Sequence, residues 1–81
     1  MQFNKELKSA SAAYIMGFSP MVKVTGASNK INTFSEVLES SRVVYELLQG
    51  NATIEMISEA LAAKSEKANL FTKATGHNWP F

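Results

Sequence analysis

The clearest pattern of apolar and polar positions lies between residues 33 and 49. Its apolar side chains recur at helical spacings, at Phe34, Val37, Leu38, Val44, Tyr45 and Leu48. This pattern predicts a helix with one apolar face, which has to be buried against other elements. Thr33 followed three residues later by Glu36 predicts a capping box at the start of this helix, and Gly50 predicts its end.

A second helix is predicted from residue 4 to residue 17. Its apolar positions step by four, three, four and four residues, at Phe3, Leu7, Ala10, Tyr14 and Phe18. Asn4 is the predicted N-cap, and Gly17 and Pro20 predict the end of the helix. Residues 21–25 follow the alternating pattern of a strand and are rich in β-branched side chains, but the sequence holds no second convincing strand to pair with them. We therefore expect an extended loop there.

A third helix is predicted from residue 52 to residue 75, with Asn51 as its N-cap and Gly76 just beyond its end. Its apolar stripe consists of Ile54, Ile57, Leu61, the stem of Lys64, Ala68 and Phe71. The segment either runs as one helix or breaks near residues 64–66 into two. Because the turn before it is short, the second and third helices should form an antiparallel αα-hairpin.

The last five residues, 77–81, contain Trp79 and Phe81 and are not expected to be helical, because a residue before proline disfavours the α conformation. Burying each of these aromatic side chains stabilises by roughly 1.5–3 kcal/mol. The tail should therefore dock, either on the helices or on a partner. The sequence predicts one small all-α domain over residues 1–81, with three or four helices, a C-terminal αα-hairpin and an aromatic tail.

Length and composition limit the size of the core. The chain has 81 residues, of which 46% are hydrophobic and 19% are charged, and it contains no cysteine. With no disulfide available, either the helices pack well or a partner completes the core, and a second copy of the chain is one such partner. No apolar run is long enough to span a membrane, and the N-terminus makes a poor secretory signal. We expect a cytoplasmic protein.

The charged and polar residues predict no catalytic chemistry, metal site or cofactor. A net charge of +1 argues against strong binding to nucleic acid. His77 is the only histidine and has no cysteine or aspartate to share a metal ion with. The serines lack a base to activate them. Arg42 is spaced to form local ion pairs with Glu39 and Glu46 on a solvated helix face. We expect a protein that is not an enzyme.

Residues 53–61 have the apolar spacing of the first helix in a helix–turn–helix reader of DNA. Such a reader also needs a turn and then a recognition helix rich in polar and basic residues. Residues 62–67 supply no turn glycine and only two lysines. A core helix is therefore the favoured interpretation, and a small phage or bacterial transcription or nucleic-acid regulator is the alternative function.

A further set of apolar residues lies mostly outside the predicted helices. Methionine and aromatic side chains that no helical stripe needs often mark a protein-contact surface, and the equal alternative is that they cap the ends of the helices. Two basic residues are available nearby for acidic groups on a partner. The predicted contact residues are Phe18, Met21, Val22, Lys23, Val24, Arg42, Trp79 and Phe81.

Three segments carry a resemblance to a known family. They are residues 1–8 (MQFNKELK), residues 16–21 (MGFSPM) and residues 74–81 (ATGHNWPF). With the length of the chain, they resemble the cytoplasmic antiholins of T-even bacteriophages, the RIII lysis-inhibition proteins. The resemblance covers the whole chain and implies a small cytoplasmic protein that binds the cytoplasmic N-terminal part of the phage holin and delays host lysis. It assigns no role to any numbered residue.

Overall fold

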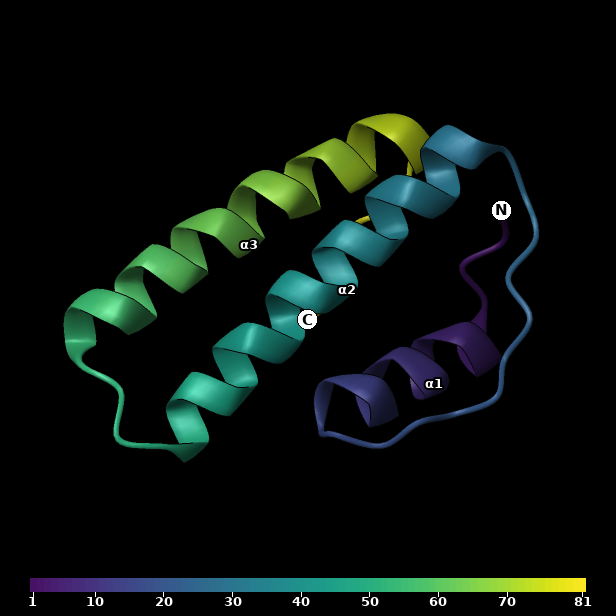
Figure 1. Cartoon of the computed structure of the whole chain (residues 1–81). Coiled ribbons are helices and arrows are strands. Elements are labelled where there is room, and N and C mark those ends of the chain that lie inside the picture. The colour runs from purple at the N-terminus through teal and green to yellow at the C-terminus, as the bar shows by residue number, and fades with distance from the viewer.

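A computed structural model describes residues 1–81 and contains three helices and no strand. The helices are α1 (Lys5–Ile15), α2 (Ser28–Gln49) and α3 (Ile54–Thr75). Figure 1 shows α2 and α3 side by side and antiparallel, with α1 packed on the opposite side of α2. The predicted all-α fold with a C-terminal hairpin and an aromatic tail is confirmed. Residues 21–25 form a loop without helix or strand, as predicted.

Helix α1 begins as predicted and ends two residues early. The Asn4 side chain accepts a hydrogen bond from the backbone N–H of Leu7 at 2.9 Å. At the other end, the N–H of Phe18 donates to the carbonyl of Ala13 and the N–H of Gly17 donates to the carbonyl of Tyr14, both at 3.0 Å. These two bonds form a Schellman motif, in which Gly17 takes a φ of +100°. The glycine therefore lies outside the helix instead of forming its last residue.

Helix α2 begins five residues before the predicted start, and the predicted capping box is wrong. Thr33 lies inside the helix, where its hydroxyl donates to the carbonyl of Lys30 at 2.9 Å. Ala27 precedes the helix and supplies no side-chain cap. Residues 28–32 contain neither glycine nor proline, so the helix can extend from Thr33 toward the N-terminus. This extension ends short of Gly26, whose φ of +152° is incompatible with a helix. The connector between α1 and α2 is therefore residues 16–27.

Helix α3 is one unbroken helix, which settles the question left open by the sequence. Its N-cap is Thr53 and not the predicted Asn51, because the Thr53 side chain accepts a hydrogen bond from the N–H of Met56 at 3.1 Å. At its end Gly76 adopts the left-handed conformation, with a φ of +76°, and Lys73 lies in the last turn. Both features of this C-terminus agree with the sequence prediction.

The core is a cluster of aromatic rings collected from four segments of the chain. Phe3 comes from the N-terminal arm, Phe34 from α2, Phe71 from α3 and Trp79 from the tail. The Phe3 and Trp79 rings are stacked at 5.6 Å, and Phe71 meets each of them edge-on at 5.3 Å. Leu7 and Val37 complete the cluster. Nine of the 81 residues are buried, which is the thin core that the length predicts.

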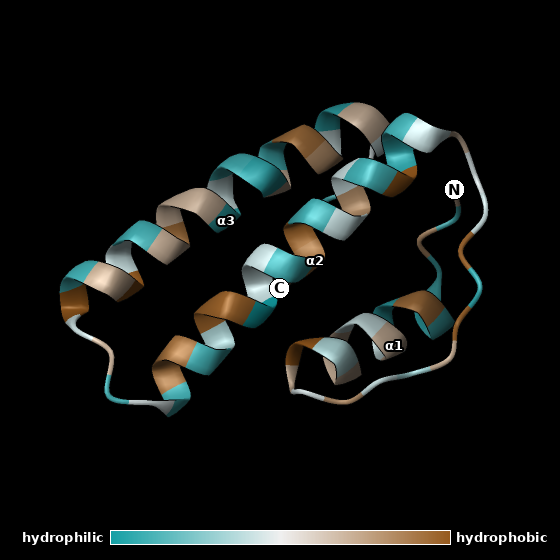
Figure 2. Cartoon of the chain, in the orientation of Figure 1, coloured by the Kyte–Doolittle hydropathy of each residue, from teal (hydrophilic) through white to brown (hydrophobic).

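The predicted apolar stripes are buried over only part of their length. Phe34, Val37 and Val44 are buried on α2, but Leu48 is 58% exposed, so its assignment to the core is wrong. On α3, Ile54 and Leu61 are also exposed. Figure 1 shows that the hairpin extends beyond α1, and Figure 2 shows hydrophobic residues on both helices close to the hairpin turn. No third element covers that end.

We predict that Phe71→Ala lowers the free energy of unfolding by about 3–5 kcal/mol, because a fully buried ring and its packing partners are lost. Phe18→Ala removes the same ring from an exposed site and should change the free energy of unfolding by no more than about 0.5 kcal/mol. Urea unfolding followed by circular dichroism measures both.

The same measurement tests the register of α2. Because Leu48 is exposed, Leu48→Ala should also change the free energy of unfolding by no more than about 0.5 kcal/mol. A loss of roughly 2 kcal/mol or more would return Leu48 to the core and contradict this packing.

Candidate functional site

The connector, residues 16–27, exposes a run of large apolar side chains. Met21 is 99% exposed and Phe18 is 61% exposed, and the neighbouring Met16 and Val22 are exposed as well. Single apolar residues are common on protein surfaces, but several in succession mark a contact surface or a binding groove. The structure thus brings the predicted contact residues Phe18, Met21 and Val22 together on one segment.

The connector also carries the predicted contact residues Lys23 and Val24. Lys23 is exposed, whereas Val24 is half-buried and packs against the core. The connector therefore touches the helical body through Val24 and leaves Met21 and Lys23 exposed. Residues 19–26 take part in no backbone–backbone hydrogen bond.

Trp79, in contrast, belongs to the core. Its ring packs against the three phenylalanine rings of the core, and its indole Nε1–H donates to the Ser41 hydroxyl at 2.8 Å. The tail thus docks on the helices, which is one of the two alternatives that the sequence left open. Deleting residues 79–81 would therefore disturb the packing of the core as well as remove the predicted contact residues Trp79 and Phe81.

Phe81 follows Trp79 and lies edge-on to it, with the ring centroids 5.4 Å apart. Its ring is 39% exposed. The carbonyl of Phe81 accepts a hydrogen bond from the Lys64 ammonium at 2.9 Å. Phe81 is therefore held on the surface of the molecule by Lys64 and Trp79 and is partly exposed.

Arg42 is engaged within the protein. Its guanidinium lies over the Tyr14 ring at 4.5 Å and pairs with Glu46 at 3.1 Å. Contacts with Tyr14 and then with Glu46 raise the pKa of Arg42 above its ordinary value. The predicted pair with Glu39 is absent, because Glu39 accepts a hydrogen bond from the Tyr14 hydroxyl. Arg42 therefore links α1 to α2, and its guanidinium is engaged within the molecule.

Sequence reasoning missed that several apolar side chains toward the turn end of the hairpin are exposed. They are Val43, Leu48, Ile54, Met56 and Leu61. Helical periodicity places Leu48, Ile54 and Leu61 on buried stripes, and it cannot show that the neighbouring helix stops short of them. No signal in the single sequence would have identified this exposure.

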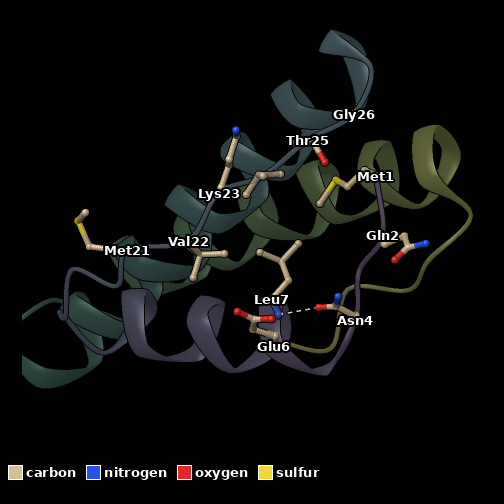
Figure 3. Close-up of a pocket in the computed structure, with 11 residues that line it drawn as sticks. Met1, Gln2, Asn4, Glu6, Leu7, Met21, Val22, Lys23, Thr25 and Gly26 are labelled. Atoms are coloured by element: carbon tan, nitrogen blue, oxygen red, sulfur yellow. Dashed lines mark hydrogen bonds between the residues drawn. The ribbon is translucent and has the colours of Figure 1, made fainter.

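Sequence reasoning also missed a recess beside the connector. It measures about 550 Å³ and lies between residues 21–26 and the first residues of the chain (Figure 3). Polar side chains line much of it, among them Gln2, Asn4, Glu6, Lys23 and Thr25. No signal marks this recess either, because the N-terminal arm and the connector are far apart in sequence.

Other kinds of site receive no support. No three His, Cys, Asp or Glu side chains come together in a way that could hold a metal ion. All three helices fall short of the length and apolar character that a membrane crossing needs. Helix α3 continues through residues 62–67, where a helix–turn–helix reader would need its turn. Comparisons with protein-family models, with curated proteins and with solved structures found no match for this chain.

We predict that Ser41→Ala lowers the free energy of unfolding by roughly 1–3 kcal/mol, because it leaves the partly buried indole N–H of Trp79 without its acceptor. The expected loss is measured by urea unfolding followed by tryptophan fluorescence.

Ser40→Ala is the matched control for this prediction. Both serine hydroxyls donate to the carbonyl four residues earlier in α2, but only Ser41 accepts a hydrogen bond from the tail. Ser40→Ala should therefore change the free energy of unfolding by no more than about 0.5 kcal/mol. Equal losses in the two variants would show that the contact between Trp79 and Ser41 does not stabilise the tail.

Proposed function

We propose that this protein is a lysis-inhibition protein of the antiholin type, which binds the cytoplasmic segment of a phage holin and delays host lysis. The observation that carries the proposal is the exposed apolar run on the connector, which includes Phe18 and Met21. A lysis inhibitor acts by binding, and this run supplies the surface. The resemblance of three segments to the RIII lysis-inhibition proteins supplies the identity of the partner.

The mechanism requires only preferential binding. A holin forms its lesion by collecting in the membrane, so an inhibitor that binds the unassembled holin more tightly than the assembled form shifts the population toward the unassembled form. Binding to a segment in the cytoplasm is sufficient for this. The inhibitor itself needs neither a membrane span nor a cofactor.

The connector supplies the parts that such an interface needs. Phe18 and Met21 are apolar anchors that a partner can bury, Val22 adds only the exposed part of a side chain that also faces the helical body, and Lys23 stands beside them for an acidic group. In protein interfaces a few central anchors contribute most of the free energy of binding, while charges at the rim steer the encounter. Arg42 and Trp79, which are engaged within the molecule, are secondary to these residues.

We predict that Met21→Asp weakens binding of the holin's cytoplasmic segment by about 2 kcal/mol or more, because it places a charge on the central anchor. The helices should persist, since Met21 is fully exposed. Isothermal titration calorimetry with the full chain and the soluble holin segment measures the affinity, and circular dichroism measures the helices.

Met56→Asp is the matched control, because it makes the same change at an exposed methionine in the first turn of α3. It should leave the affinity within about 0.5 kcal/mol, as expected for a residue outside the interface. Equal affinities for the two variants would remove the connector from the interface. No binding of the holin segment by the unchanged protein, with steeply salt-dependent binding to duplex DNA instead, would favour a nucleic-acid regulator.

A further inference from the structure

Residues 21–25, Met-Val-Lys-Val-Thr, have the sequence of a β-strand in a protein without a sheet. Three of the five are β-branched, and apolar residues alternate with Lys23. Residues 21–25 have no regular secondary structure, and Figure 3 shows them following one another along an outstretched trace. None of their backbone groups forms a backbone–backbone hydrogen bond. A segment of this composition normally forms such bonds with a neighbouring strand.

The side chains of this segment alternate as they do in a half-buried strand. Val22 and Val24 line a small cleft together with Leu7, Phe34 and Leu38 from the helical body. Met21 and Lys23 are exposed on the other side. When side chains point toward and away from the body, the backbone N–H and C=O groups point sideways, along the surface. Neither hydrogen-bonding edge of the segment is paired with another part of the backbone.

A recess lies beside this segment, between it and the first residues of the chain. Figure 3 shows the connector on one side of the recess and the N-terminal arm with the start of α1 on the other. Its volume of about 550 Å³ is in the range of sites that bind ligands. It is lined by polar as well as apolar side chains, which suits the backbone of a bound peptide.

We propose that residues 21–25 are an open strand edge that binds an extended, acidic segment of a partner protein by β-augmentation. In this mode the main-chain hydrogen bonds provide affinity, and alternate side chains provide specificity. The proposal deepens the proposed function, on which it rests only for the identity of the partner. The mode of binding follows from the unpaired backbone and the recess.

Charge selects the kind of segment that fits. Of the four lysines among residues 1–32, Lys23 alone lines the recess and stands in the middle of the strand, and the single acid, Glu6, lines the recess from the start of α1. Opposite charges that face each other across two strands stabilise the pair, and like charges destabilise it. A second copy paired antiparallel about Lys23 would place two lysines opposite each other. A segment with a glutamate or aspartate opposite Lys23 is therefore the favoured occupant.

The first experiment uses the unchanged full chain and a synthetic probe, the acetylated and amidated peptide Thr-Val-Glu-Val-Thr-Val. Amide hydrogen exchange is measured by NMR with and without millimolar peptide. We expect alternate amides in residues 21–25 to exchange at least about tenfold more slowly with the peptide, because only alternate N–H groups point to one edge. Unchanged exchange in this segment would overturn the proposal. Protection that appears without peptide and grows with protein concentration would assign the edge to a second copy and overturn it as well.

The second experiment compares two proline variants, Val22→Pro and Lys23→Pro, for affinity to the same peptide. Neighbouring N–H groups point to opposite edges, so one variant should bind at least about tenfold more weakly and the other should change by less than about threefold. Each is compared with a variant that removes the side chain but keeps the N–H, Val22→Ala or Lys23→Gln. Equal effects of the two prolines would overturn strand pairing.

The holin segment separates this proposal from the proposed function. If that segment binds and neither proline variant weakens it, the strand edge is overturned and the proposed function stands. If the holin segment does not bind but the synthetic peptide protects alternate amides, the proposed function is overturned and the strand edge stands.

Discussion

The packing of four aromatic rings against one another is the interaction on which the rest of this structure depends. Phe3, Phe34, Phe71 and Trp79 come from four separate segments, and every pair among them lies within ring-to-ring contact distance. Removing any one segment would expose part of the other three rings. In a chain without disulfides, this cluster is what ties the N-terminal arm and the tail to the hairpin.

The position of the cluster explains where apolar surface remains exposed. It lies where the arm, the tail and the beginning of α2 meet the end of α3, so these segments cover one end of the hairpin. The molecule is 37 Å long, and its opposite end has only two helices. Apolar residues such as Leu48 and Ile54 are therefore exposed although their helical spacing is regular.

How far the sequence predicts this fold depends on the range of the interactions involved. Features that arise within one turn of chain are predictable, such as the Asn4 cap, the glycine after α3 and the hairpin. The start of α2 is not predictable in this way. Thr33 suits a capping box as well as it suits the interior of a helix that begins at Ser28. Local pattern alone cannot choose between these two starts.

The candidate site shows the same limit. Met21 and Phe18 stand out in the sequence because no helical stripe needs them, and both are exposed on the connector. Trp79 stands out for the same reason but packs in the core, since its place is decided by Phe3 and Ser41, which are far from it in sequence. The recess beside the connector also depends on a distant segment, the N-terminal arm.

The connector owes its exposed backbone to the way in which its two ends are held. One end follows the Schellman motif of α1, and the other passes so close to Met1 that a Cβ on Gly26 would lie 2.9 Å from the Met1 nitrogen. Val24 packs against the core between these two points. An extended segment held at both ends and in the middle loses little conformational freedom when it binds, and low ordering cost favours affinity. The aromatic core thereby fixes the position of the connector, because it holds in place the Met1 and Phe3 arm against which the connector rests.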